Sequence, residues 1–213
     1  PTTFCQGGSV VLTASAGSSY LWSNGATTQA ITASTTGCYS VTVTNANGCS
    51  TTSACTQVTV NALPVATISS LNGNSFCQGG SVTLVSTPGS TYVWSNNLTT
   101  QSINVTASAN LTVTVTNANG CSAAVSAPVV VQALPNAATT VAGSTVFCQG
   151  GSVSFTANAG NGYSYLWSNG ATTATISTSI SGNNTVTVTN LIGCSTTSAV
   201  NAVVVNPIPS ATL

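Results

Sequence analysis

The chain has 213 residues and contains no Lys, Arg, Asp, Glu or His, so its formal net charge at pH 7 is zero. Soluble domains usually carry roughly a quarter charged residues, and a chain without them has no salt bridge, carboxylate dyad, imidazole base or carboxylate metal site. We therefore expect no enzyme activity and no cofactor, because general acid–base catalysis needs such groups. We also expect no nucleic-acid partner, because phosphate binding draws on Lys and Arg.

Hydrophobic residues make up 42% of the chain and recur in short alternating runs. This content argues against disorder, which combines low hydrophobicity with high net charge. No apolar run approaches the roughly 20 residues of a membrane-spanning helix, so we expect no membrane insertion. A neutral surface also lacks the charge repulsion that keeps proteins apart, which favours self-association.

The segment 1–64 predicts a series of short strands. Apolar residues alternate with polar ones at Val10, Leu12 and Ala14; at Tyr20 and Trp22; at Ile31 and Ala33; at Tyr39, Val41 and Val43; and at Val58 and Val60. Turn residues separate the runs, as at Asn24-Gly25 and in the segment 45–48. Alternation with a period of two, together with closely spaced turns, is typical of a β-sandwich.

The same pattern occurs three times. FCQGGSV is found at 4–10, 76–82 and 147–153, and VTVTN at 41–45, 113–117 and 186–190, each followed by Gly-Cys-Ser. Leu-Pro or Ile-Pro separates the repeats. We predict three tandem modules in a linear array: copy one (1–64, without a first strand), copy two (65–135) and copy three (136–208). Residues 209–213 would be the first strand of a following module or a donor strand.

The pattern FCQGGSVTL, YLWSNGATTQ and YSVTVTNANGCS resembles the immunoglobulin-like and PKD-like repeats of very large secreted surface proteins of Bacteroidetes, of the gliding-motility and adhesin type. The resemblance covers all three copies. It implies seven-stranded immunoglobulin-like sandwiches, export through the type IX pathway and a place at the cell surface. The family usually carries some Asp, Lys and Glu, and this chain has none.

Eight cysteines, two per copy and an extra pair in copy one, indicate disulfides and an oxidising compartment. No CxxC spacing is present, so we expect no metal site. Cys38 opens the predicted strand that contains Val41 and Val43, the sixth of an immunoglobulin-like module. Cys55 lies in the seventh and last strand, which contains Val58, and the midpoint between the two cysteines falls in the turn at 45–48. Both have the outward parity of their strands, so we predict that they face each other and form a disulfide.

The other six cysteines allow two pairings. The usual arrangement for small modules is intra-module: Cys5–Cys49, Cys77–Cys121 and Cys148–Cys194. The immunoglobulin topology implied by the resemblance puts Cys5 and Cys49 at opposite ends of a module, roughly 17–23 Å apart, whereas a disulfide needs Cα atoms about 5.5 Å apart. The alternative is inter-module, Cys5–Cys121 and Cys77–Cys194, which leaves Cys49 and Cys148 for neighbouring copies. Both remain open.

The C-terminus repeats the start of a module that does not follow. Two explanations remain: the chain is a segment of a longer repetitive protein, or the strand containing Ser210, Ala211, Thr212 and Leu213 completes copy one of the next subunit by β-augmentation. Either arrangement is a linear fibre, because a head-to-tail contact that does not close gives an open filament.

The sequence therefore predicts a structural component of an extracellular filament or stalk, whose partners are copies of itself or neighbouring modules. The alternative is a cell-surface adhesin repeat whose inter-strand loops bind glycans or a partner. Trp22, Trp94 and Trp167 occupy inward positions of the alternating pattern, so we expect them in the module cores rather than on a sugar-stacking surface.

Overall fold

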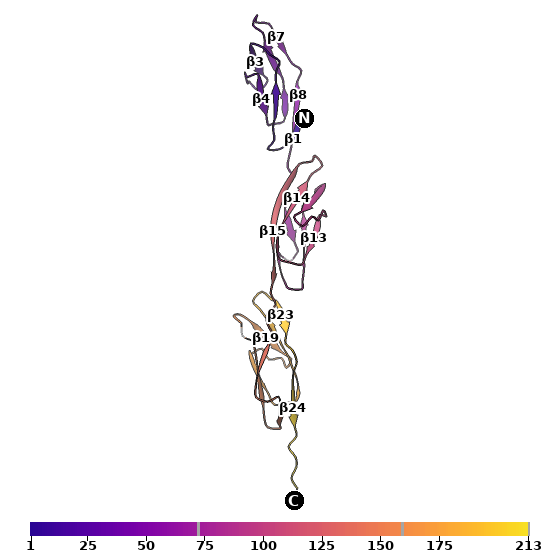
Figure 1. Ribbon diagram of the computed structural model, residues 1–213, viewed down its shortest axis with the longest axis vertical. Helices are drawn as coiled ribbons and strands as arrows, with labels where there is room; N and C mark the ends of the chain where they lie inside the picture. Colours follow the sequence, from indigo (N-terminus) through magenta and orange to yellow (C-terminus); the bar gives the residue numbers. More distant parts are fainter. Residues whose placement is uncertain (72, 159, 213) are drawn as a thin grey trace. The chain divides into compact units, whose positions relative to one another are not determined.

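The computed structural model describes residues 1–71, 73–158 and 160–212 and is all-β (Figure 1). Within these ranges every named element is a strand, and no helix is long and apolar enough to cross a membrane. Copy one contains β1 (Thr3–Cys5), β2 (Val10–Thr13), β3 (Ser19–Trp22), β4 (Ala30–Ala33), β5 (Gly37–Tyr39), β6 (Val41–Thr44), β7 (Ser50–Thr52) and β8 (Thr56–Asn61).

The strands of the later copies follow the same order. Copy two contains β9 (Ile68–Ser70), β10 (Ser75–Cys77), β11 (Val82–Ser86), β12 (Thr91–Trp94), β13 (Ser102–Val105), β14 (Ala109–Thr116) and β15 (Ser122–Gln132). Copy three contains β16 (Thr139–Ala142), β17 (Val146–Cys148), β18 (Val153–Ala157), β19 (Ser164–Trp167), β20 (Thr175–Thr178), β21 (Gly182–Asn184), β22 (Val186–Thr189), β23 (Ser195–Thr197) and β24 (Asn201–Asn206).

The sheets of each copy use the same pairings. In copy three they have the orders β16-β18-β20, β17-β24-β21 and β19-β22-β23. Copy one repeats them as β1-β8-β5 and β3-β6-β7, but its remaining sheet contains only β2 and β4 among the described residues. Copy two has β13-β11-β9 and a four-stranded sheet, β10-β15-β14-β12.

The predicted strand that Cys38 opens and that continues through Val43 is interrupted in copy one, and Cys55 lies before the last strand rather than in it. β5 pairs with β8 in one sheet, whereas β6 pairs with β3 and β7 in another. The chain therefore passes between sheets at Ser40, as strands do at the corners of sandwiches. Copy three is interrupted at the equivalent place, between β21 and β22, whereas β14 of copy two is continuous.

The chain forms two compact units. The first comprises Pro1–Gly73, Thr83–Val105 and Ala109–Pro128, and the second Asn74–Val82, Thr106–Ser108 and Val129–Leu213. Copy one lies within the first unit, and β15 of copy two passes from the first unit into the second.

One tryptophan lies in the core of each copy. Trp22, Trp94 and Trp167 are 5%, 1% and 2% exposed. Each indole Nε1 donates a hydrogen bond of 2.8 Å to a backbone carbonyl of the following turn, at Thr28, Thr100 and Thr173 respectively. The indole N–H is thus satisfied although the ring is buried, as a buried tryptophan requires.

Candidate functional site

A short strand that the sequence pattern did not indicate positions the first cysteine of each copy. β1 pairs in parallel with β8, so that Phe4 lies opposite Val60 and Cys5 opposite Asn61. The pairing continues with a 2.8 Å hydrogen bond from the Gln6 amide to the Asn61 carbonyl. β10 and β17 make the same parallel pairing with β15 and β24. The first cysteine of each copy therefore lies beside the C-terminal end of the last strand of the same copy.

A turn positions the second cysteine. In copy two, the Asn117 side-chain Oδ1 accepts hydrogen bonds of 3.0 Å from the amides of Asn119 and Cys121. Gly120 of this turn has a φ of 77°, which glycine adopts at no steric cost. The turn presents Cys121, which is 1% exposed and lies in the same compact unit as copy one.

A disulfide and a hydrogen bond connect these two cysteine segments. Cys5 and Cys121 are disulfide-bonded, with Cα atoms 5.6 Å apart and a sequence separation of 116. The Asn117 Nδ2 donates a 3.0 Å hydrogen bond to the carbonyl of Ala62, directly after β8. We use the word joint for this combination of a disulfide between two copies and a hydrogen bond from an asparagine side chain of one copy to a backbone carbonyl at the end of the copy before it.

A second joint occurs within the second unit. Cys77 and Cys194 are disulfide-bonded, with Cα atoms 5.5 Å apart and a sequence separation of 117. The Asn190 Oδ1 accepts from the amides of Ile192 and Cys194, and its Nδ2 donates to the carbonyl of Ala133 at 3.4 Å. The structure thus has the pairs Cys5–Cys121 and Cys77–Cys194, each between two different copies of the sequence repeat, and it does not bring together Cys5–Cys49, Cys77–Cys121 or Cys148–Cys194.

The third disulfide lies inside copy one. Cys38 and Cys55 are bonded, with Cα atoms 5.5 Å apart. Their surroundings differ from the predicted hairpin, because Cys38 is in β5 directly opposite Gln57 and Cys55 precedes β8. The bond therefore joins the two segments at which the chain passes between sheets, rather than two facing residues of one hairpin.

Cys49 and Cys148 are free and exposed. Cys49 follows a turn like those of the joints, since the Asn45 Oδ1 accepts from the amides of Asn47 and Cys49. Cys148 ends β17, the equivalent of β1. Cys49 therefore occupies the position in its copy that Cys121 has in copy two, and Cys148 the position that Cys5 has in copy one.

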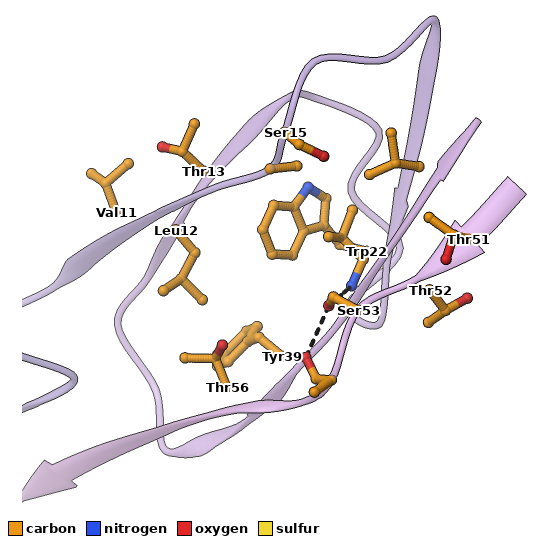
Figure 2. A pocket seen from close by; sticks show the side chains of 14 residues that line it. Val11, Leu12, Thr13, Ser15, Trp22, Tyr39, Thr51, Thr52, Ser53 and Thr56 are labelled. Atoms are coloured by element: carbon orange, nitrogen blue, oxygen red, sulfur yellow. Dashed lines mark hydrogen bonds between the residues drawn. The ribbon is translucent and has the colours of Figure 1, made fainter. Parts of the chain in front are cut away.

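Copy one has a groove at the edge of β2. It encloses about 420 Å³ and is lined by β2 with the residues that follow it, by Trp22, Tyr39, Val41 and Val43, and by the segment around β7. Figure 2 shows Leu12, Trp22 and Tyr39 around the opening, with Thr51, Thr52 and Ser53 across from them. The lining contains no charged side chain, because the chain has none.

Copies two and three cover the same edge with a strand of their own. β9 pairs with β11, and β16 with β18. Ala137, just before β16, is 5% exposed and packs in the core cluster that includes Trp167. In copy three, β16 thus supplies the edge pairing, and Ala137 in the segment before it supplies a side chain to the core.

Burial at equivalent positions differs between copy one and the later copies. Leu12 is half-buried, whereas Leu84 of copy two is 0% exposed. Val43 is half-buried, whereas Val115 and Val188 are 0% exposed. The core of copy one therefore lacks the cover that a first strand provides.

The C-terminal segment lies away from any strand pairing. Residues Ser210, Ala211 and Thr212 are exposed and belong to no strand. Leu213, the last residue of the predicted donor strand, lies outside the described residues. Ile208, which precedes this segment, is 63% exposed.

No protein-family model and no curated protein matches this chain. Among solved structures, it is similar to the N-terminal eight Ig domains of Down Syndrome Cell Adhesion Molecule, at a TM-score of 0.55 and 16% identity, over 96% of this chain and 35% of that chain. The chain thus spans about a third of that structure. This likeness confirms the predicted class, an all-β protein of immunoglobulin-like fold.

Two bacterial proteins are also similar at lower TM-scores. One is a Ca²⁺-stabilized adhesin that helps an Antarctic bacterium bind ice, with a TM-score of 0.44 and 17% identity over 98% of this chain and 72% of that chain. The other is a 1.5-MDa bacterial ice-binding adhesin, with a TM-score of 0.42 and 16% identity over 97% of this chain and 95% of that chain.

Proposed function

We propose that this chain is a structural component of an extracellular filament or stalk, built from immunoglobulin-like modules at 1–64, 65–135 and 136–208 in a linear array. The observation that carries the proposal is the repeated joint. Two joints combine the same disulfide with the same asparagine-to-carbonyl bond. A flexible string of independent domains needs no such connection, whereas a stalk must restrict the angle between successive modules.

The composition supports the same function. A surface without Lys, Arg, Asp, Glu or His offers no charged side chain to acid, salt or charge-directed proteases near neutral and acidic pH. Three disulfides suit an oxidising location outside the cytoplasm. We propose that the protein lies at a bacterial cell surface, and the resemblance of its repeats to secreted Bacteroidetes proteins suggests export by the type IX pathway.

Peptide mapping of the disulfides tests this proposal. The chain has no trypsin site, so the digest requires pepsin or a chymotrypsin-like protease under non-reducing conditions. We expect linked peptides that contain Cys5 with Cys121 and Cys77 with Cys194. Peptides in which Cys5 is linked to Cys49 and Cys77 to Cys121 would show that each disulfide lies within one copy. The copies would then have no covalent cross-link between them, and the proposal would be overturned.

Small-angle X-ray scattering then tests whether the joints restrict the chain. The Cys5→Ser/Cys121→Ser double variant should broaden the distribution of interatomic distances, because copies one and two would move about residues 62–65. The Cys38→Ser/Cys55→Ser double variant is the matched control, since its bond lies inside copy one, and it should leave the distribution unchanged. Equal distributions for both variants would show that the joint restricts nothing.

A further inference from the structure

We propose that Asn47 and Asn119 are modification sites, at which the side-chain amide is lost by spontaneous deamidation and an aspartate or isoaspartate is left behind. Each asparagine is followed by glycine and lies in the turn that presents the second cysteine of its copy. The inference concerns the chemistry of these turns and does not rest on the proposed stalk.

The reaction needs only an Asn-Gly pair and water. The backbone nitrogen of glycine gives up its proton and attacks the side-chain Cγ of asparagine, so that a C–N bond forms and a succinimide ring closes. The bond from Cγ to the side-chain nitrogen breaks, and that nitrogen leaves with the proton as ammonia. Water then opens the ring, at Cγ to give aspartate or at the backbone carbonyl to give isoaspartate. Glycine favours the attack because it has no Cβ to crowd its nitrogen.

Four of the six Asn-Gly pairs in the sequence share one turn geometry. In each, the glycine amide donates a hydrogen bond of 2.9–3.0 Å to the backbone carbonyl three residues earlier, and the φ of the glycine lies between 77° and 85°. The four glycines are Gly25, Gly48, Gly120 and Gly170. Since the attacking nitrogen is held in the same way in all four turns, differences in rate must come from the asparagine side chains.

In two of these turns the asparagine side chain is held by a hydrogen bond. The Asn24 Oδ1 accepts a bond of 3.1 Å from the Ala26 amide, and the Asn169 Oδ1 accepts one of the same length from the Ala171 amide. The acceptor in each case is the asparagine that would react. Its side chain must therefore break this bond before Cγ can turn toward the glycine nitrogen.

In the turns at Asn47 and Asn119 the corresponding amide already has another acceptor. In copy two this amide belongs to Cys121, and the Asn117 Oδ1 accepts from it at 3.0 Å; copy one has the same bond at the same distance. The side chains of Asn47 and Asn119 are exposed and make no hydrogen bond with any residue that the structure describes. They are therefore free to reach the reactive arrangement.

The expected difference in rate follows from this one hydrogen bond. The net contribution of a typical protein hydrogen bond corresponds to a ratio of about fivefold between the held and the released side chain. Asn47 and Asn119 should therefore deamidate about fivefold faster than Asn24 and Asn169.

Deamidation at Asn119 changes the first joint. Both products carry a carboxylate, which no side chain of the unmodified chain has. Isoaspartate also adds a backbone atom between positions 119 and 120. The Asn117 Oδ1 accepts from the amides of Asn119 and Cys121 at 3.0 Å, and a lengthened turn cannot keep both bonds. The modification thus brings a negative charge and a distorted turn to a joint that is otherwise neutral.

The experiment uses the full 213-residue chain, incubated in mildly alkaline H₂¹⁸O and sampled over time. Digestion with pepsin in acid stops the reaction, and mass spectrometry measures the labelled carboxylate at each Asn-Gly pair. Methylation by a protein-isoaspartate methyltransferase identifies the isoaspartate. We expect label at Asn47 and Asn119 about fivefold faster than at Asn24 and Asn169. Equal rates at the four positions, or slower reaction at either of the first two, would overturn the proposal.

Copy three allows the site to be created. Its turn has Ile192 before the glycine, 60% exposed, and the Asn190 Oδ1 accepts from the amides of Ile192 and Cys194. Ile192→Asn should therefore deamidate at position 192 as fast as Asn119 does. Leu191→Asn is the matched control, because its asparagine is also exposed but is followed by isoleucine, and it should remain unmodified over the same period.

The variants separate the cause from the position. If position 192 of Ile192→Asn reacts no faster than Asn169, the competing acceptor is not what releases the side chain and the inference fails. Asn119→Gln keeps an amide at the turn but removes the reactive pair, so label and isoaspartate should disappear from this turn alone. Slow reaction at Asn47 and Asn119 would leave the stalk proposal untouched, since that proposal is tested by the disulfide map.

Discussion

Replacing Leu12 and Leu84 by alanine, one at a time, removes the same atoms from equivalent positions of copies one and two. Leu84 is 0% exposed, and Leu-to-Ala changes at such sites lower the free energy of unfolding by about 3 kcal/mol, through lost burial and the cavity left behind. Leu12 is half-buried and lines the open groove. Its substitution leaves no closed cavity and forfeits about half of the burial, so we expect a loss of about 1.5 kcal/mol.

Hydrogen exchange followed by mass spectrometry measures both effects in one chain, because peptides from β2 and β11 report on the opening of their own copies. A tenfold change in the exchange rate of an amide corresponds to a change of about 1.4 kcal/mol in the free energy of the opening that exposes it. Amides of β11 should therefore exchange about 100-fold faster in Leu84→Ala, and those of β2 about 10-fold faster in Leu12→Ala. In a chain with the sequence of residues 63–72 placed before Pro1, which supplies β2 with a partner strand like β9, the effect of Leu12→Ala should rise to about 100-fold. Equal accelerations in the unextended chain would refute the claim that the core of copy one is incomplete.

Three further predictions concern the joints and the missing charges. The Cys5→Ser/Cys121→Ser variant removes a cross-link with a sequence separation of 116, and its free energy of unfolding should fall by about 5 kcal/mol if the disulfide acts by restricting the unfolded chain. The Cys38→Ser/Cys55→Ser variant removes a cross-link with a separation of 17 and should lose only about 3 kcal/mol. Equal urea midpoints for the two variants would contradict this dependence on loop length. Asn117→Ala removes two turn bonds and one bond across the joint, so the urea midpoint should fall by the equivalent of about 2 kcal/mol; an unchanged midpoint would show that these bonds contribute nothing. The free energy of unfolding should vary by less than about 0.5 kcal/mol between about pH 4.5 and 7.5, since no side chain titrates there; a sloping profile in calorimetry would oppose this.

The alternating pattern was sufficient to predict the strands that pack against the core. Trp22 and Val41 follow the period of two, and both are buried in the structure. Burial of one face of a strand leaves a direct signature in the sequence, because every second residue must be apolar. The class of fold could therefore be inferred without any homologous structure.

Features that depend on distant partners could not be read in this way. β1 is too short to show alternation, and it forms only because β8, at the far end of the same copy, offers an edge for parallel pairing. The passage between sheets at Ser40 is likewise set by the strands on either side. The sequence indicated that copy one lacks a first strand, but only the structure shows which side chains this leaves uncovered.

The two joints also determine which residues carry load when the chain is stretched between its ends. Tension applied at residue 1 crosses from Cys5 to Cys121, returns along the backbone to Cys77 and crosses again to Cys194. This covalent path contains about 70 residues, so even the fully unfolded chain would extend to only about 250 Å, against about 750 Å without the cross-links. Segments 6–76 and 122–193 lie outside this path and bear no load, so the two cross-links set an upper limit on how far tension can lengthen the protein.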